Sequence, residues 1–461
     1  MKNVTLLPKI IFKKLPLLLG FIAFCIQSYA YPPVSIIYVK QNASGANNGT
    51  SWTDAYTSLQ TAITNASAGT QIWVAAGTYK PTTGTDRDIT FSLKNDVAIY
   101  GGFPNTGNPT FDDRNWHTNV TILSGEIGTS AVEDNSRRII FNDNINSSAI
   151  LDGFTIRDAY NTSTFSGAEG GGLRNQNSSP TILNCIFRNN NIANSGGGVA
   201  NMSSSSPTYT NCLFIGNYAG YHGGASCSVG GSNPSFINCS FFGNTAGVYG
   251  GALFNNASGT NTTLKNCIVW GNTSSDNSVF YKSSGTVTVT YSLVQDGYTG
   301  TGNINTDPLF VDATNGDFRL QQCSPAINVG EDAANSTTLD LGKNTRKVGF
   351  IDMGAYEYQS AGGVPTAYAV NGSGDFCEGG TGVEITMSNV RPAVSYQLKR
   401  DNINVGTPIA GSLTTFGYHN QAGTYTVVAT SLLNGCTNTM SNTISINNLP
   451  TAYNVGGGGS F

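Results

Sequence analysis

Three charged residues that lie close together in the sequence, Asp152, Arg157 and Asp158, have the side chains that acid–base chemistry on sugars would need. Glycoside hydrolysis uses two carboxyl groups that face each other across the scissile bond. Elimination from a uronate instead uses Lys or Arg as the base, often beside Ca²⁺ held by carboxylates. The alternative interpretation is that all three form ion pairs or lie in solvated loops. The same alternatives apply to the charged residues that precede them, which are Asp86, Arg87, Asp88, Arg137 and Arg138.

Four cysteines recur at an almost constant interval and could hold a metal, form disulfides or fill a core. They are Cys185, Cys212, Cys239 and Cys267, separated by 27, 27 and 28 residues. Metal sites use short paired spacings with histidine partners, so the long interval favours buried cysteines that act as small apolar residues. A disulfide between neighbouring copies is the alternative, because strands about 4.8 Å apart fall within the Cα separation that a bridge tolerates. We expect no metal and no cofactor, and Ca²⁺ only if the chain is a lyase.

The cysteines belong to a repeated sequence motif, called a phrase below, and this motif indicates which secondary-structure elements position the cysteines. Each cysteine is preceded by Asn and followed two residues later by Phe or Val, and each phrase is closed by one of the asparagines Asn190, Asn217, Asn244 and Asn272. Apolar and polar residues alternate over short stretches bounded by Gly, Asn or Ser-Pro, which is typical of strands and turns. One such unit cannot enclose a core, whereas stacked units can. We therefore predict an all-β parallel solenoid with the cysteines in one interior column and the asparagines in ladders at the turns.

These repeats resemble those of the pectate-lyase-like right-handed parallel β-helix superfamily. The phrases Gly-Gly-(Ala/Gly)-hydrophobic, as at 170–173, and Phe-x-x-Asn, as at 187–190, are similar to the repeats of chlamydial polymorphic outer-membrane proteins. Residues 38–79 resemble the N-terminal cap of the superfamily, with a predicted helix over 52–63 that covers the apolar end of the solenoid. The resemblance spans 31–358 and implies the fold, but a fold does not determine an activity.

Relatives with this fold include polysaccharide lyases and polygalacturonases, and the polygalacturonase motifs are matched only in part. Three motifs have counterparts in the wrong order, and the sequence has no Arg-Ile-Lys; the counterparts are Asp112-Asp113, Tyr221-His222-Gly223 and Asn305-Thr306-Asp307. The last of these falls at the start of residues 307–358, which resemble the choice-of-anchor Q region of Bacteroidetes surface proteins. We expect an adhesive or structural module that binds glycans or surface proteins. The alternative is a lyase or glycoside hydrolase acting on acidic polysaccharides, with the three charged residues named first as its catalytic candidates.

Residues 1–30 have the three parts of a secretory signal peptide: four lysines, an apolar run from Leu15 to Ile26, and small residues at Ser28 and Ala30. The apolar run is shorter than the roughly 20 residues of a spanning helix. We therefore predict export to the cell surface, in association with the outer membrane, or secretion, with no membrane insertion of the mature chain. Removing four of the 23 basic residues and none of the 27 acidic ones changes the formal net charge from −4 to about −8. This acidity, without a basic cluster, argues against a nucleic-acid partner.

A second unit follows a short linker at 359–364. Residues 365–449 contain short alternating strands and resemble the Ig-like repeats of Bacteroidetes proteins exported by type IX secretion. Cys377 and Cys436 are predicted to form its disulfide, because small exported domains commonly carry one. Residues 450–461 repeat the beginning of this unit, so we expect the chain to be a fragment that ends within a second Ig-like repeat.

Overall fold

The structure is a computed structural model that describes residues 35–448 except positions 361, 373 and 377–379. The predicted signal peptide, the second Ig-like repeat and Cys377 lie outside the described residues. Strands dominate what is described, with one α-helix and four short 3-10 turns. Within these residues, no helix is long and apolar enough to cross a membrane.

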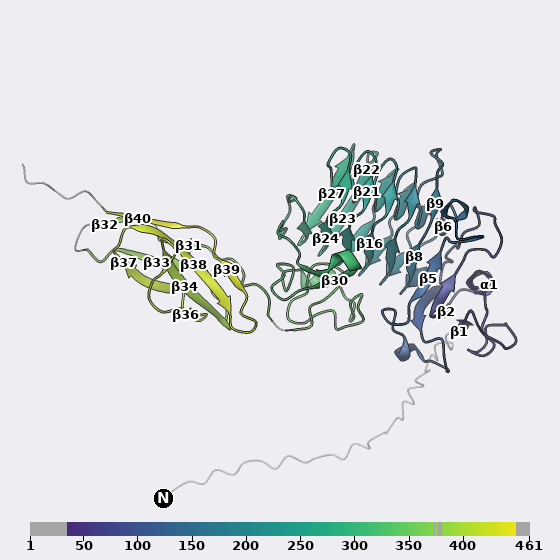
Figure 1. Ribbon diagram of the computed structural model, residues 1–461, viewed down its shortest axis with the longest axis horizontal. Helices are drawn as coiled ribbons and strands as arrows, with labels where there is room; N and C mark the ends of the chain where they lie inside the picture. Colours follow the sequence, from purple (N-terminus) through teal and green to yellow (C-terminus); the bar gives the residue numbers. More distant parts are fainter. Residues whose placement is uncertain (1–34, 361, 373, 377–379, 449–461) are drawn as a thin grey trace, which may run out of the picture. The chain divides into compact units, whose positions relative to one another are not determined.

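The first part of the described chain is a parallel β-helix of about eight turns, built from four sheets (Figure 1). Sheet A contains β1 (Ser35–Val39), β2 (Thr70–Ala75), β4 (Ala98–Phe103), β7 (Ile150–Asp152), β11 (Thr181–Leu183), β15 (Thr208–Thr210), β19 (Ser235–Ile237), β23 (Asn261–Lys265) and β27 (Thr286–Thr290). Sheet B contains β3 (Gly77–Tyr79), β5 (Thr121–Ser124), β8 (Thr155–Arg157), β12 (Ile186–Arg188), β16 (Leu213–Ile215), β20 (Ser240–Phe242), β24 (Ile268–Trp270) and β28 (Leu293–Val294).

Two narrower sheets complete each turn. Sheet C contains β6 (Ile140–Asp143), β10 (Leu173–Gln176), β14 (Val199–Met202), β18 (Ser226–Val229), β22 (Leu253–Asn256) and β26 (Phe280–Lys282). Sheet D contains β9 (Tyr160–Asn161), β13 (Asn191–Ile192), β17 (Tyr218–Ala219), β21 (Thr245–Ala246) and β25 (Thr273–Ser274). Neighbouring strands come from successive turns and pair in parallel, so each sheet follows the order of the chain.

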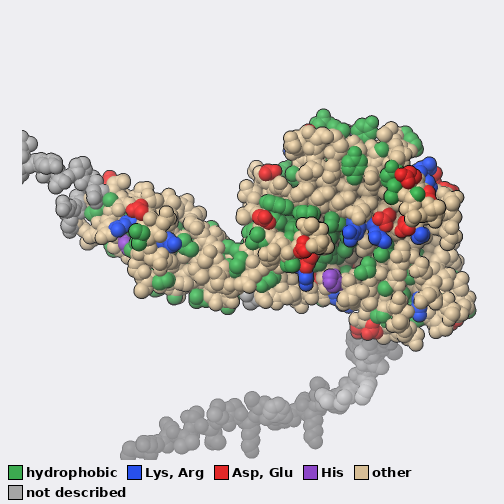
Figure 2. Space-filling model, viewed as in Figure 1, with side chains coloured by type: hydrophobic (Ala, Val, Ile, Leu, Met, Phe, Trp, Pro, Cys, Tyr) green, Lys and Arg blue, Asp and Glu red, His purple; other side chains and the backbone are tan. Residues whose placement is uncertain are grey.

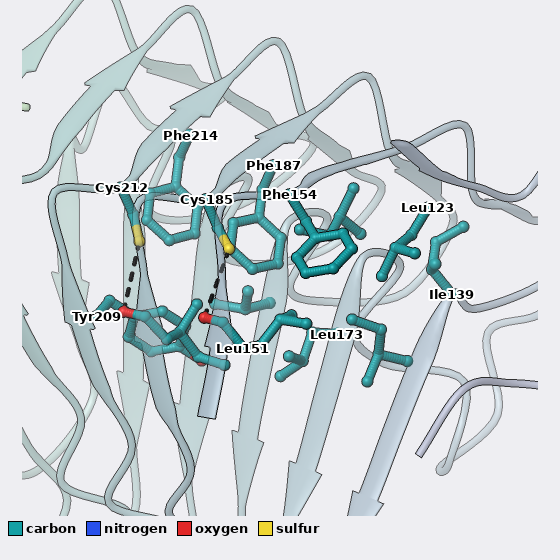
Figure 3. Packing of buried hydrophobic residues seen from close by; sticks show 14 of the residues in the cluster. Leu123, Ile139, Leu151, Phe154, Leu173, Cys185, Phe187, Tyr209, Cys212 and Phe214 are labelled. Atoms are coloured by element: carbon teal, nitrogen blue, oxygen red, sulfur yellow. Dashed lines mark hydrogen bonds between the residues drawn. The ribbon is translucent and has the colours of Figure 1, made fainter. Parts of the chain in front are cut away.

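Pairing in register places equivalent residues of successive turns over one another. On sheet B the rings of Phe187, Phe214 and Phe241 stack with centroids 5.0 and 4.8 Å apart and planes within 5° of parallel. Figure 3 shows Cys185 and Cys212 side by side in the same core. The four repeated cysteines each precede the first residue of β12, β16, β20 or β24, and these strands pair in register. The structure therefore places them in one column, and none of them has exposed surface.

A second interior column consists of asparagine amides at the corner between sheets B and D. Asn190 Nδ2 donates to Asn217 Oδ1 at 3.0 Å, and the next two steps, to Asn244 and Asn272, measure 2.9 and 2.8 Å. Each amide also donates to a main-chain carbonyl of the preceding turn, as Asn190 does to Ile156 at 3.2 Å. Because their polar atoms are paired, these amides avoid the cost of burying an unsatisfied group. The ladder predicted at these positions is confirmed.

Residues 307–358 return along the solenoid and cover the outer face of sheet B. Here β29 (Phe310–Asp312) and β30 (Asp317–Leu320) pair antiparallel. Apolar side chains of the segment pack in two clusters against outward-facing residues of sheet B. The segment contributes Phe318, Leu320, Leu341, Met353 and Tyr356, and sheet B contributes Leu213, Ile268 and Leu293.

A third row of asparagines ties this segment to the solenoid. Asn184, Asn211, Asn238 and Asn266 each precede a cysteine of the column and have φ between 49° and 55°. This left-handed conformation is one that Asn tolerates. Asn238 Nδ2 donates to the Asp352 carbonyl at 2.8 Å, and Asn266 Nδ2 donates to a carbonyl of the segment at 3.0 Å. Asn211, Asn238 and Asn266 are therefore both corner residues and anchors for the covering segment, whereas the amide of Asn184 donates to Asp152.

The helix near the N-terminus is shorter than its sequence pattern predicts. Helix α1 spans Leu59–Asn65, with Ser58 as its N-cap, and Leu59, Ala62 and Ile63 are buried in the main core cluster. The prediction of a helix from residue 52 is wrong, because Trp52 belongs to a separate aromatic cluster and its indole donates to the Pro109 carbonyl at 2.8 Å.

Residues 365–448 form a second body with two sheets that share one buried cluster. The smaller sheet contains β31 (Val370–Asn371), β33 (Val383–Met387) and β37 (Thr415–His419). The main path of the larger sheet contains β32 (Gly374–Phe376), β40 (Ile444–Asn448), β38 (Gly423–Ser431), β34 (Val394–Arg400) and β35 (Ile403–Asn404). Off this path, β36 (Ile409–Ala410) pairs with β34 and β39 (Thr437–Thr439) pairs with β38.

Removing one amide of the buried ladder should destabilise the β-helix. Asn190→Ala deletes the side-chain bonds to Asn217, Ile156 and Ala159, and we expect a loss of about 2–3 kcal/mol in the free energy of unfolding, because buried partners are left unpaired. The measurement is the midpoint of urea unfolding followed by circular dichroism. The neighbouring Asn191 is exposed, so Asn191→Ala is the control; equal losses in both variants would contradict the ladder's role.

Candidate functional site

Asp152 is held in a buried ion pair at the edge of sheets A and B. Its carboxylate lies 2.9 Å from Arg114 Nη2, and the side chains are only 9% and 4% exposed. Arg114 also donates to the Asp152 carbonyl at 2.6 Å, and its guanidinium lies 4.6 Å from the centre of the Trp116 ring. Asn184 Nδ2 donates to the same carboxylate oxygen, Oδ1, at 2.8 Å, and the second oxygen, Oδ2, accepts from Arg114 Nη1 at 3.0 Å. Every acceptor of Asp152 is thus engaged within the protein.

Arg157 and Asp158, the other two catalytic candidates, pair with each other. Arg157 Nε lies 3.0 Å from Asp158 Oδ2, which also accepts a hydrogen bond from Ser124 at 3.2 Å. Asp152 ends a strand of sheet A, whereas Arg157 ends a strand of sheet B. Of the three candidates, the structure therefore pairs only Arg157 with Asp158. Asp152 is paired with Arg114, which was not a candidate. The three candidates do not form two facing carboxyl groups with a gap for a substrate.

The cysteines divide into a buried free set and one disulfide. Cys185, Cys212, Cys239 and Cys267 are free, and burial raises the pKa of the Cys185 and Cys239 thiols well above the ordinary value, which keeps them unreactive. Within the described residues, no group of three or more His, Cys, Asp or Glu is arranged to hold a metal.

The predicted disulfide partner of Cys436 is wrong. Cys436 is bonded to Cys323, from the segment that covers sheet B, with Cα atoms 5.4 Å apart. The prediction paired Cys436 with Cys377 because both lie in the second unit. The bond instead joins cysteines 113 residues apart, and this choice of partner is set by tertiary proximity, which spacing in the sequence does not reveal.

The covering segment contains a cluster of buried charges. Arg346 and Glu357 form an ion pair at 3.1 Å with side chains 1% and 0% exposed. Burial, together with the charge of Asp352, raises the pKa of Glu357 to about 8, and burial raises the pKa of Asp352 to about 7. Asp352 Oδ1 accepts from the Asn328 N–H at 2.7 Å. These contacts lie within the segment, so the cluster holds its loops together.

The outer face of sheet A between β11 and β27 is the open flank of the solenoid. A file of hydroxyl residues runs along it in register: Thr181, Thr208, Ser235, Thr263 and Thr288. Their spacing follows the strand separation of about 4.8 Å. The inward-facing residues that alternate with them are apolar and buried, so strand alternation alone fixes this file on the solvent side.

A groove of about 520 Å³ lies at the far end of this file. Its floor is formed by β19, β23 and β27, and its wall by Ala333 and Ala334. Lys265 lines the groove, and its Nζ lies 2.7 Å from Glu331 Oε2. Within the described part of the chain, the hydroxyls of Ser235, Thr263, Thr288 and Thr290 make no hydrogen bond to protein, so each is free to bind a ligand. The floor of the groove could have been found from the sequence, because hydroxyl residues alternate with apolar ones there, as in the run 286–290. The wall could not, because it comes from a loop that is distant in the sequence.

A parallel β-helix with a covered sheet B and an open polar sheet A defines the class of this protein. The chain belongs to the family described as "Protein of unknown function (DUF1565)", whose model matches residues 42–293. Among solved structures it is similar to the crystal structure of pectate lyase Pel9A, with 15% sequence identity and a TM-score of 0.30, covering 70% of this chain and 96% of that chain. No curated protein matches the chain.

The raised pKa of Glu357 predicts that stability falls as pH rises. The folded chain holds a proton near pH 7 that an unfolded Glu, with a pKa of about 4.3, has released. We therefore expect the free energy of unfolding to decrease between about pH 5 and about pH 8, and to level off above the folded pKa. Urea midpoints across this range measure the effect. Glu357→Gln should make the slope shallower and leave the part due to Asp352, whose pKa is raised to about 7. Glu133→Gln, at an exposed position, should leave the curve unchanged. A slope in Glu357→Gln as steep as that of the unaltered chain would contradict the assignment.

The disulfide can be checked by peptide mapping without reduction. We expect one linked pair of peptides containing Cys323 and Cys436, and peptides with free thiols for the buried column. Alkylation before and after unfolding should show that the column thiols react only when the core opens, because buried thiols stay protonated. A linked pair containing Cys377 and Cys436 would restore the original prediction.

Proposed function

We propose that the protein binds glycans through the outer face of sheet A without converting them. The observation that carries this proposal is the in-register hydroxyl file that leads into the groove around Thr263 and Lys265. Hydroxyls at a regular spacing suit a ligand that repeats along one direction, such as an extended polysaccharide. The groove volume lies in the range typical of ligand sites, roughly 300–1,000 Å³.

The charged residues support binding over turnover. Asp152 is neutralised by Arg114, and Arg157 by Asp158. The outer face of sheet B is occupied by the covering segment and offers no room for a polymer along most of its length. The groove itself contains one ion pair, between Lys265 and Glu331. Such a set of groups suits hydrogen bonding better than acid–base catalysis, which needs an acid and a base beside one substrate atom.

Further parts of the proposal rest on the sequence patterns. We propose that the solenoid is right-handed, that α1 closes its N-terminal end, and that export through the signal peptide 1–30 takes the chain to the cell surface or the medium. Residues 365–449 are proposed to be an Ig-like β-sandwich that spaces the binding face from its anchor, in the manner of Bacteroidetes proteins with repeats of the polymorphic outer-membrane type and type IX secretion.

The groove proposal is tested with the purified mature chain and a panel of neutral and acidic polysaccharides. We expect retention on at least one polymer and no unsaturated or reducing-end product. Thr263→Ala combined with Thr288→Ala removes two free hydroxyls and should weaken binding about tenfold or more, since each lost hydrogen bond costs roughly 1 kcal/mol.

The matched control is Thr118→Ala combined with Thr407→Ala, two exposed threonines away from sheet A. This double variant should bind like the unaltered chain. Equal weakening in both double variants, or no retention on any polymer, would refute the groove as the binding site. Product formation that disappears in Arg157→Gln would instead support the lyase or hydrolase alternative.

A further inference from the structure

One connection in the solenoid breaks the repeat. Between sheets D and C the chain takes 11 residues in the turn that links β9 to β10 (162–172), but six in each of the next three turns: 193–198, 220–225 and 247–252. Insertions in a repeat protein map to loops and often carry function.

The longer loop closes a small cavity at the corner of sheets C and D. The cavity has a volume of about 100 Å³ and is lined by Arg87, Arg137, Arg138, Asn161 and Phe165, among others. The space is large enough for a group of a few heavy atoms. Phe165, at its rim, is 67% exposed.

The charges around this cavity do not balance. Arg137 pairs with Asp88, whose side chain is 69% exposed. Arg87 donates only to main-chain carbonyls, through Nε to Asn135 and Nη2 to Tyr160, both at 2.6 Å. Arg138 likewise donates to main-chain carbonyls through Nε and Nη2. Within the described residues, neither Arg87 nor Arg138 forms an ion pair, and the Nη1 atom of each has no hydrogen-bond acceptor.

Glu169, the acidic residue of the inserted loop, pairs with a fourth arginine and offsets the charge of Arg138 only in part. Glu169 lies 3.8 Å from Arg174 and accepts a hydrogen bond from the Gly167 N–H at 2.9 Å. Burial, and then the charge of Arg174, lower the pKa of Arg138 to about 10. Three guanidinium groups thus face one small space that only one exposed carboxylate lines, and partly buried cations with too few counter-charges are costly.

We propose that this cavity is a binding site for a single anionic group, a sulfate or a carboxylate, carried by a glycan. Guanidinium groups bind such oxyanions through paired N–H donors. The cavity takes the anionic substituent, and the sugar ring lies against the exposed face of Phe165, an aromatic contact common in ligand sites. The site shares no residue with the groove on sheet A, so a failure of one proposal does not affect the other.

The test measures binding of inorganic sulfate, a sulfated oligosaccharide, an oligouronate and a neutral oligosaccharide by calorimetry at low ionic strength. We expect one charged oligosaccharide to bind at least about tenfold more tightly than free sulfate, because the ring adds contacts. Any binding of the neutral one should be unchanged by Arg137→Gln, because it would take place at the sheet A groove. Sulfate alone binding as tightly as either glycan would overturn the glycan as the source of the anion.

Three single variants separate the site from general charge attraction. Arg137→Gln should weaken binding about tenfold, since a charge-assisted bidentate contact is lost. Arg188→Gln removes an exposed arginine of sheet B and should change affinity less than twofold. Asp88→Asn frees Arg137 and should tighten binding several-fold, a gain that a folding defect cannot produce. Equal losses in Arg137→Gln and Arg188→Gln, or no gain in Asp88→Asn, would overturn the site.

Discussion

Parallel stacking in register is the constraint on which the rest of this structure depends. Each residue lies about 4.8 Å above its equivalent in the turn below, so any residue type in the repeat becomes a column through the molecule. A column is stable only if its residue can contact a copy of itself. Phenylalanine rings do so by stacking at 4.8–5.0 Å, cysteines by packing as small apolar groups, and asparagine amides because each carries both a donor and an acceptor. A column of charges of one sign would repel itself.

The same constraint explains the near absence of charge from the repeats and its place elsewhere. Only 11% of the residues are charged, and Figure 2 shows acidic and basic side chains gathered mostly toward the N-terminal turns of the solenoid, beside broad uncharged surfaces. Buried charges occur where the repeat gives way to irregular chain: Asp152 with Arg114 from a loop, and Arg346 with Glu357 in the covering segment. Irregular chain can offer each charge a different partner, which a column cannot.

The repeat made the solenoid predictable, and departures from the repeat limited the prediction. The spacing of the cysteines and asparagines was enough to place them in columns, because equivalent positions must coincide. The partner of Asp152 was not predictable, since Arg114 lies 38 residues earlier in a loop without periodicity. The bond between Cys323 and Cys436 depends on the path that residues 307–358 take over sheet B, and no local sequence pattern predicts that path. The start of α1 was misplaced because Trp52, at helical spacing from Leu59, packs in another cluster.

Binding surfaces on such a scaffold can arise in two ways, and we propose that this chain uses both. An unbroken column on the solvent side, such as the file containing Thr208 and Thr263, offers identical groups at one spacing and so suits a repeating ligand. An interruption creates a unique pocket, as the 11-residue connection does beside Arg138. The first kind depends on many weak contacts that tolerate single changes, whereas the second depends on a few charges that do not. Selection for a particular ligand would therefore act most strongly on the inserted loop, while the residue types in the columns are constrained mainly by the stability of the fold.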